Sequence, residues 1–394
     1  MIQRDSGKKG ERIVKKPYLP PCALLTSAPA PMPSPHFEFC IIGQGLAGTT
    51  LAWMLKSRNK SVLVLDRNEM VTSSRIAAGL LTPITGPKLA STGYWDDCRD
   101  RAEAFYQQIE QLTGNRFFRT QPAAHLLRSE AEQQLFQTRI QSPAFQQLAC
   151  PLGPADRNPY WLAPWGAFEM PTAAQLDVAR YLDCSREIFV RTESLLQTEF
   201  SPFADLKVTP ETLRFPRLGF TADHLIFCQG YQPDLSPWFD AVQFRPAKGE
   251  ILTLRIPELR ENRSAHSGCW LAPFPTFQTG AAPLNDLYIL GSTFEWKVLD
   301  CIPTTTASEQ LLTQLRCWLN CPVEVIRQQA AVRPTMKDFQ PVLGIHPQEP
   351  RIGILNGLGT RGSLMAPWLA ELLMNHLELQ TPLPPQLDVQ RWFP

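Results

Sequence analysis

The sequence predicts an α/β protein whose core is a parallel sheet, and three observations support this fold class. Residues 37–66 read as strand, glycine turn, helix and strand, and residues 351–377 read as strand, glycine loop and helix. Such alternation is typical of parallel sheets, because parallel strands need a long crossover connection. The chain has 394 residues, 44% of them hydrophobic and 19% charged, as is usual for a globular protein of two or more domains.

The first unit has the order of a dinucleotide-binding motif. The apolar run at 37–42 predicts a buried strand, and apolar residues recur at helical spacing over 46–55. The run at 61–65 predicts a second strand, which stops at the acidic residue Asp66.

Three glycines in the sequence GQGLAG, residues 43–48, have separate expected roles. Gly43 permits a tight turn, Gly45 lets the backbone approach a pyrophosphate, and Gly48 lets the helix pack close to the sheet. The helix N-terminus offers free N–H groups to phosphate, and Asp66 lies 18 residues after Gly48, where a ribose-binding acid is expected. The residues alone leave open an ordinary βαβ unit with a glycine-rich turn, and leave open FAD or NAD as the dinucleotide.

Two other segments favour a bound ligand. Small residues are dense from Ser73 to Gly79, and small side chains let the backbone approach a large flat group, although a plain loop is the alternative. Near the C-terminus, a helix is expected from about Ser363, and its N-terminus at 360–364 could direct N–H groups at a ligand.

The remaining pattern predicts further helices and strands. Helices are expected at 96–112, 130–148 and 171–182. Strands are expected at 187–195, 224–230, 245–256 and 286–296, with a pair of short strands within 204–223. Residues 151–171 read as a loop or as short strands.

Composition argues against several classes of protein. Residues 1–35 are rich in proline and positive charge and predict a disordered leader. No run approaches the roughly 18 apolar residues of a transmembrane helix, and a net charge of +1 gives no sign of nucleic-acid binding. Ten scattered cysteines, without histidines at metal-ligand spacing, predict free thiols in a reducing cytoplasm and no metal site.

These stretches together resemble the D-amino-acid oxidase family of FAD-dependent oxidoreductases. The segment GLGTRGSLMAP, residues 357–367, is most similar to glycine oxidase and to the oxidase domain of a tRNA wobble-uridine modification enzyme. The matching stretches occur in family order at 43–48, 66, 73–79, 225–230, 246–249, 333–341 and 357–366.

The resemblance implies FAD as the cofactor and a Rossmann-like FAD-binding domain with a parallel sheet. An interleaved substrate domain would be built on an antiparallel sheet. The expected boundaries are 1–35 for the leader, 36–90, 166–244 and 326–394 for the FAD-binding domain, and 91–165 and 245–325 for the substrate domain.

The resemblance also implies which residues contact FAD. Asp66 would bind the adenosine ribose, a strand at 189–192 would pass the adenine with Val190 in contact, and the loop at 357–364 would hold the pyrimidine edge of the flavin. The full expected set is Gly43, Gly45, Leu46, Ala47, Gly48, Asp66, Arg67, Ser73, Ser74, Ala77, Ala78, Gly79, Val190, Gly230, Gly359, Thr360, Arg361, Gly362, Ser363 and Leu364.

The implied activity is oxidation of the C–N bond of a small amine or amino acid by hydride transfer to flavin N5. FAD would be non-covalent, since no cysteine stands near Val332, where sarcosine oxidases carry their flavin-linking cysteine. Arg333, and with less support Arg361, would bind and orient a substrate carboxylate. O₂ or a quinone would accept the electrons. The alternatives are a tRNA wobble-uridine side-chain oxidase and a flavin-binding electron carrier without amine oxidation.

Overall fold

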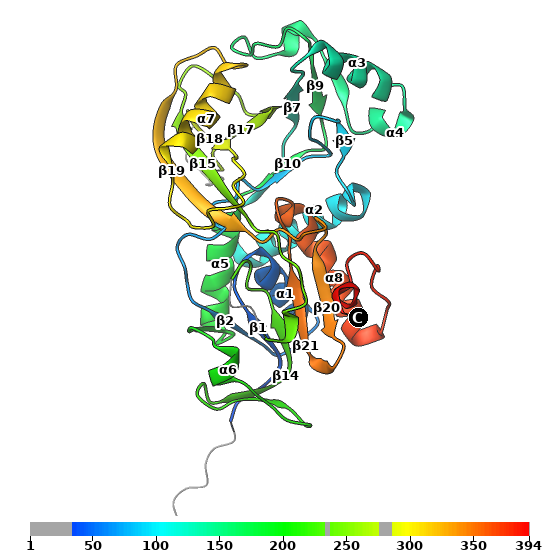
Figure 1. Ribbon diagram of the computed structural model, residues 1–394, viewed down its shortest axis with the longest axis vertical. Helices are drawn as coiled ribbons and strands as arrows, with labels where there is room; N and C mark the ends of the chain where they lie inside the picture. The colour runs from blue at the N-terminus through cyan, green and yellow to red at the C-terminus, as the bar shows by residue number, and fades with distance from the viewer. Residues whose placement is uncertain (1–33, 233–236, 276–285, 394) are drawn as a thin grey trace, which may run out of the picture. The chain divides into compact units, whose positions relative to one another are not determined.

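The computed structural model describes residues 34–232, 237–275 and 286–393, which carry two large β-sheets and the helices packed on them (Figure 1). The predicted leader at 1–35 lies outside these ranges except for its last two residues.

The first sheet is mainly parallel, as the sequence predicts. Its strands are β1 His36–Ile42, β2 Val62–Asp66, β11 Leu195–Gln197, β12 Lys207–Val208, β13 Leu213–Phe215, β14 Phe220–Phe227, β20 Val342–His346 and β21 Glu349–Asn356. Neighbours are parallel in the order β11-β2-β1-β14-β21, while β20 and the β12–β13 hairpin add antiparallel strands. The central strands are buried on both faces, which explains why they read as continuous apolar runs.

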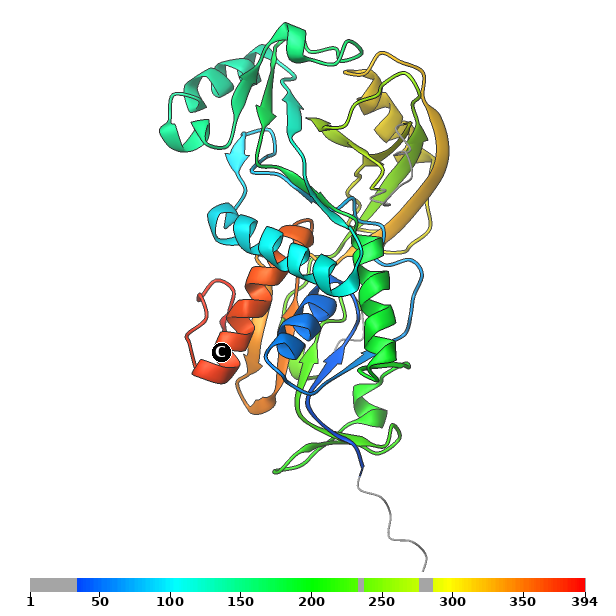
Figure 2. The ribbon, with the colours of Figure 1, turned by 180° about the vertical axis from the view of Figure 1, so that it is seen from behind.

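Four helices lie together on one face of this sheet (Figure 2). They are α1 Leu46–Ser57, α2 Trp95–Thr113, α5 Val178–Arg191 and α8 Gly362–Leu379. Their apolar residues share one buried cluster with the sheet. The opposite face is covered by a cluster rich in phenylalanine, including Phe215, Phe227 and Phe239.

The second sheet is almost entirely antiparallel. Its strands are β7 Ala123–Leu126, β8 Cys150–Leu152, β9 Ala167–Met170, β15 Ala247–Arg255, β16 Ser264–Ser267, β17 Cys269–Pro273, β18 Leu287–Gly291 and β19 Glu324–Arg333. The strand order is β19-β15-β18-β17-β16-β7-β9-β8, and only the pair β16–β7 is parallel. Helix α7, Thr305–Arg316, packs on one face through a buried cluster that includes Leu311 and Leu315.

The remaining elements are short. They are β3 Leu80–Leu81, β4 Ile84–Thr85, β5 Ala90–Ser91, β6 Phe118–Thr120, β10 Ala174–Leu176, α3 Glu130–Arg139, α4 Pro143–Gln146, α6 Pro202–Asp205, and the 3-10 turns Pro154–Asp156, Pro237–Phe239 and Val389–Trp392. Within the described ranges, no helix combines the length and apolarity that crossing a bilayer requires. The same ranges hold no cluster of potential metal ligands, and each cysteine in them is a free thiol.

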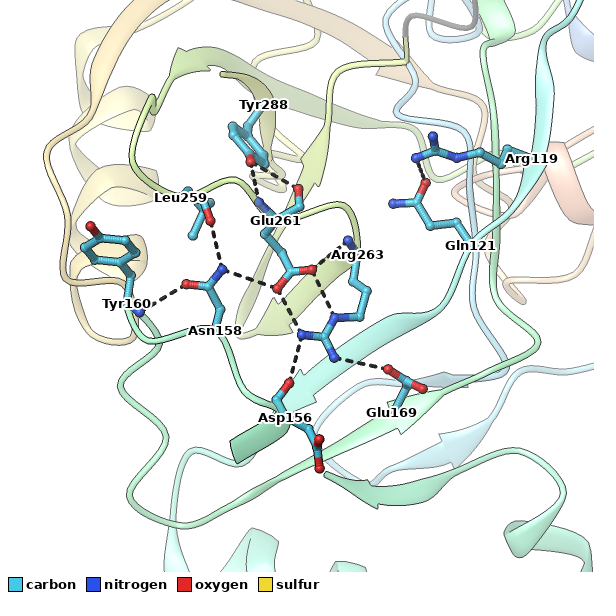
Figure 3. Close-up of polar contacts among 10 residues, drawn as sticks. All are labelled: Arg119, Gln121, Asp156, Asn158, Tyr160, Glu169, Leu259, Glu261, Arg263 and Tyr288. Carbon is cyan, nitrogen blue, oxygen red and sulfur yellow. Dashed lines mark hydrogen bonds and ion pairs between the residues drawn. The ribbon is translucent and has the colours of Figure 1, made fainter. Parts of the chain in front are cut away.

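A polar network ties the loops of the second sheet together (Figure 3). Arg263 donates to Glu261 at 3.0 Å and to Glu169 at 3.1 Å, and Asn158 donates to the Leu259 carbonyl at 2.8 Å. Tyr288 donates to the Glu261 carbonyl at 3.0 Å. Because these charges are paired within the network, we treat it as structural.

Three element predictions were wrong. The helix expected at 130–148 breaks into α3 and α4, because Pro143 cannot continue a helix. The helix expected at 171–182 starts only at Val178, after β10, where Asp177 accepts a cap bond from Arg180 N–H at 3.0 Å.

Most of the strand expected at 187–195 is instead helix, because residues 187–191 are the end of α5 and only Leu195 belongs to a strand, β11. Tyr181, Ser185 and Phe189 recur every four residues and form a buried face, so tertiary packing overrides the β-propensity of the segment IFV. Val190 therefore lies on a helix rather than a strand, and it is 55% exposed.

Three elements pack with the other predicted domain than the one to which the expected boundaries assign them. Strands β9 and β19 pair within the second sheet, although β9 and most of β19 were expected in the FAD-binding domain. Helix α2 was expected in the substrate domain, but Tyr106 on this helix donates to the Ser363 carbonyl of α8 at 2.9 Å. The division into an FAD-binding and a substrate domain stays a prediction.

Candidate active site

A cavity of about 1060 Å³ lies between the glycine turn of the first sheet and one face of the second sheet. Almost every residue predicted to contact FAD lines it. These residues are Gly43, Gly45, Leu46, Ala47, Asp66, Arg67, Ser73, Ser74, Ala77, Ala78, Gly79, Gly230, Gly359, Thr360, Arg361, Gly362, Ser363 and Leu364, and Arg333 joins them. Gly48 and Val190 do not line the cavity.

The three glycines of the turn stand where a side chain would meet neighbouring atoms. Gly43 has φ +101°, and a Cβ there would lie 2.6 Å from the Cys228 carbonyl oxygen. A Cβ on Gly48 would overlap the Gly43 carbonyl oxygen, so Gly48 serves the packing of α1, as the sequence predicts. Gly45 is the N-cap residue of α1 and offers no capping side chain, and a Cβ there would meet Ser74 Oγ at 3.1 Å. Ser74 Oγ accepts from Leu46 N–H at 3.2 Å, and the other N–H groups of the first turn, beside bare backbone, fit a pyrophosphate.

The second glycine loop places another helix start beside the first. Gly357 and Gly359 have φ +74° and +55°, and α8 also begins without a side-chain cap. A Cβ on Gly362 would meet Leu46 Cδ1 at 3.0 Å, so the first turns of α1 and α8 are in contact. Two helix N-termini therefore border one cavity, which favours an anionic or strongly polar ligand.

Asp66 is held by three donors at the end of β2. Its carboxylate accepts from Gln44 N–H at 2.9 Å, from Asn68 N–H at 2.8 Å and from Arg186 Nη1 at 3.0 Å. Arg186 also donates to Gln44 Oε1 at 2.9 Å, so one guanidinium fixes both residues. The sequence analysis missed Arg186 because it predicted no helix there. A helix extended to residue 191 would have placed Arg186 one turn after Leu182, whose carbonyl accepts from Gln44 Nε2 at 2.8 Å.

We expect Arg186→Leu to weaken FAD binding by about tenfold, the equivalent of one lost charge-assisted hydrogen bond. Without the guanidinium, Asp66 and Gln44 lose the contact that fixes their side chains. Titration of the apoprotein with FAD, followed by flavin fluorescence, measures this. Arg191→Leu is the matched control, because Arg191 is exposed in the last turn of the same helix. Unchanged affinity in Arg186→Leu would contradict the positioning role.

Arg333 ends β19 and points along the cavity-facing side of the second sheet. A Cβ on Gly249 of β15 would overlap the Arg333 guanidinium, so the side chain lies directly over this glycine. Nη1 donates to the Thr293 carbonyl at 3.2 Å, and the guanidinium lies 4.6 Å from the centre of the Phe294 ring. Among the described residues, no carboxylate lies within ion-pair distance of Arg333. Burial lowers its pKa to about 10, so it remains a cation at neutral pH.

Arg361 is oriented differently. Its Nη2 donates to the Phe339 carbonyl at 2.9 Å, and Nη1 lies beside Gly93. Neither Phe339 nor Gly93 lines the cavity, although Arg361 itself does. The guanidinium therefore ties the start of α8 to neighbouring loops, and it is the weaker candidate for binding substrate.

Over residues 38–375 the chain matches the DAO family, described as FAD dependent oxidoreductase. Iminodiacetate oxidase from Chelativorans sp. BNC1 superposes with a TM-score of 0.71 at 20% identity, covering 90% of this chain and 98% of that one. Glycine oxidase from Bacillus cereus ATCC 14579 superposes with a TM-score of 0.73 at 16% identity, covering 88% and 96%. These two likenesses show the fold.

One curated relative is the tRNA 5-methylaminomethyl-2-thiouridine biosynthesis bifunctional protein MnmC of Psychrobacter cryohalolentis. It is 24% identical over an alignment of 367 residues, and the match covers 84% of this chain and 52% of that protein. The chain thus spans about half the length of this relative.

Proposed function

The chain belongs to the DAO family of FAD dependent oxidoreductases, and on this basis we propose that it oxidises the C–N bond of a small amine or amino acid. The observation that carries the proposal is Arg333, a half-buried cation without a carboxylate partner among the described residues, at the wall of the cavity that would hold FAD. A planar guanidinium grips a carboxylate through two parallel hydrogen bonds. An amino acid is therefore the preferred substrate class.

FAD, when bound, supplies the acceptor for the hydride that leaves the carbon beside the amine. The chain supplies orientation: Arg333 holds the carboxylate end of the substrate, and Gly249 leaves the space in which the guanidinium lies. Ile251, Ile289, Ala331 and Ile76 form an apolar cluster beside it, which excludes water and favours an unprotonated amine. We assign no general base, because a neutral amine needs none.

An anaerobic substrate panel tests the proposal. The FAD-loaded protein would be mixed with glycine, N-methylglycine, iminodiacetate and proline, and with amines of similar size that lack a carboxylate. We expect loss of the visible flavin absorbance with at least one carboxylated amine. Bleaching by a reduced nicotinamide but by no amine would favour the electron-carrier alternative. Repeating the reoxidation with O₂ and with a soluble quinone identifies the electron acceptor.

We expect the FAD to be non-covalent. No cysteine stands next to Arg333 in the sequence. Of the three described cysteines that line the cavity, Cys228 and Cys269 are poor nucleophiles because burial raises the pKa of both thiols, and Cys301 is exposed. Acid precipitation should release all of the yellow colour into the supernatant. Flavin fluorescence that stays with the polypeptide on a denaturing gel would contradict this.

The second candidate is oxidation of a wobble-uridine side chain of tRNA. The likeness to MnmC supports it, whereas the near-neutral net charge of +1 gives it no electrostatic support. Flavin reduction by hypomodified tRNA, under conditions in which no free amino acid bleaches the flavin, would favour this candidate.

We propose the cytoplasm as the compartment, since the described cysteines are free.

A further inference from the structure

The cavity-facing side of the second sheet carries a row of side chains in register. Cross-strand pairs join Ile251 to Gly291, Gly291 to Trp270, Trp270 to His266 and His266 to His125. Directly paired residues on neighbouring strands point to the same face. All five residues line the cavity, so the row extends it across the sheet from β15 to β7.

The row has an apolar middle and two polar ends. At one end, the Arg333 guanidinium lies over Gly249, two residues before Ile251 on β15. In the middle, a Cβ on Gly291 would overlap the Trp270 indole, so this ring covers the glycine. The other end consists of His266 and His125. A ligand that occupies the whole row therefore needs an apolar centre between two polar groups.

The histidine end is polar but uncharged. Burial lowers the pKa of His125 to about 4 and that of His266 to about 3, so both imidazoles are neutral at neutral pH. His125 is only 6% exposed, and its Nε2 has no hydrogen-bond partner among the described residues. A buried polar atom without a partner is costly, and a ligand group that completes its hydrogen bond explains its presence.

The neighbouring Arg128 does not give the histidine end of the cavity a net positive charge. Arg128 lines the same end of the cavity, but its guanidinium donates twice to Glu132 Oε1, at 2.8 and 3.1 Å. Its charge is thereby balanced. The histidine end therefore suits an uncharged donor or acceptor better than a second carboxylate.

We propose that His125 and His266 form a second polar subsite, which binds an uncharged hydrogen-bonding group at the far end of an extended amino-acid substrate. This rests on the proposed function, because Arg333 holds the carboxylate at the other end. The guanidinium lies over Gly249 of β15, and β16 and β7 are three and four strands away. At about 4.8 Å per strand, the two polar ends are roughly 14 to 19 Å apart. An N-substituted amino acid with a terminal amide spans such a distance, whereas glycine occupies one end.

The test compares two ligands by anaerobic calorimetry on the FAD-loaded protein. Both are glycines N-substituted with the same flexible chain, which ends in a carboxamide in one and in a similarly shaped isopropyl group in the other. The wild type should bind the carboxamide about tenfold more tightly, as two neutral hydrogen bonds predict. His125→Phe keeps the ring that stacks on Phe168 at 4.8 Å but has no ring nitrogen, and it should reduce the preference to about twofold or less.

The control is His224→Phe. His224 is a half-buried imidazole whose buried Nδ1 has no hydrogen-bond partner among the described residues, and it stacks on Phe39 at 5.1 Å, but it does not line the cavity. It should keep the tenfold preference. Should His125→Phe fail to fold, His266→Phe replaces it.

Three results would overturn the subsite: equal binding of both ligands by the wild type, an undiminished preference in the His125 and His266 variants, or no binding of either ligand. Flavin reduction by glycine or another short amine would leave the proposed function standing in each case. The two proposals can therefore fail separately.

Discussion

Gly45→Val is expected to weaken FAD binding by at least about 100-fold and to yield a colourless protein. The reason is that the pyrophosphate must approach the bare backbone at this glycine, and the valine side chain would fill that space. Gly45 is the N-cap residue of α1, and a Cβ on it would already lie 3.1 Å from Ser74 Oγ. The two methyl groups of valine would occupy the space beside the N–H groups of the first helical turn. Flavin content after purification and titration of the apoprotein with FAD measure the effect.

The matched control is Met54→Val, which introduces the same β-branched residue into α1 at a position outside the cavity. It should bind FAD like the wild type. The Gly45→Val and Met54→Val apoproteins should have similar thermal unfolding midpoints, because Gly45 lies at the start of the helix and not in its interior. A Gly45→Val protein with a full complement of FAD would show that the glycine turn does not hold the pyrophosphate.

Arg333→Ala is expected to lower kcat/KM for flavin reduction by an amino acid by roughly 30- to 1,000-fold, which corresponds to about 2 to 4 kcal/mol for a lost bidentate charged contact. Arg333→Lys should recover only part of this loss, because an ammonium lacks the planar fork. FAD content should be unchanged in both variants. Anaerobic stopped-flow reduction gives the rates, and equal rates in all three proteins would remove Arg333 from the substrate site.

Gly249→Ala offers an independent test of the same contact. The added methyl group would overlap the Arg333 guanidinium, whose flexible side chain can move away without unfolding the sheet. We expect a higher KM with the arginine itself intact. Gln329→Ala, on the same face of β19 but outside the cavity, is the control. A normal KM in Gly249→Ala would mean that the position of the guanidinium over Gly249 is unimportant.

Local patterns predicted most of the residues that line the glycine-turn end of the cavity, whereas their contacts with FAD stay a prediction. The backbone of the turn at 43–48 and of the loop at 357–364 needs glycine at particular positions. At Gly43 and Gly48, for example, a Cβ would clash with the backbone. Such glycines can be recognised in the sequence. The acid at the end of β2 follows from the same motif. These residues lie close together because neighbouring parallel strands bring their carboxyl ends to one edge of the sheet.

Long-range pairing was the part that the sequence did not predict. Arg186 contacts Asp66 from helix α5, in which the segment IFV has strand propensity. The segment is helical because the helix buries the face that carries Tyr181. The row from Ile251 to His125 depends on the order of five strands that are scattered along the chain. Strand order is a property of the folded sheet, so no local pattern could place the two histidines across from Arg333.

The most direct test of C–N oxidation is a single anaerobic turnover of the wild-type protein with the amino acid that bleaches it best. The account predicts one carbonyl product and one released amine or ammonia for each flavin reduced. It also predicts slower bleaching when the hydrogens beside the amine are replaced by deuterium. Flavin that stays oxidised with every carboxylated amine, or that bleaches without a carbonyl product and without an isotope effect, would contradict the account.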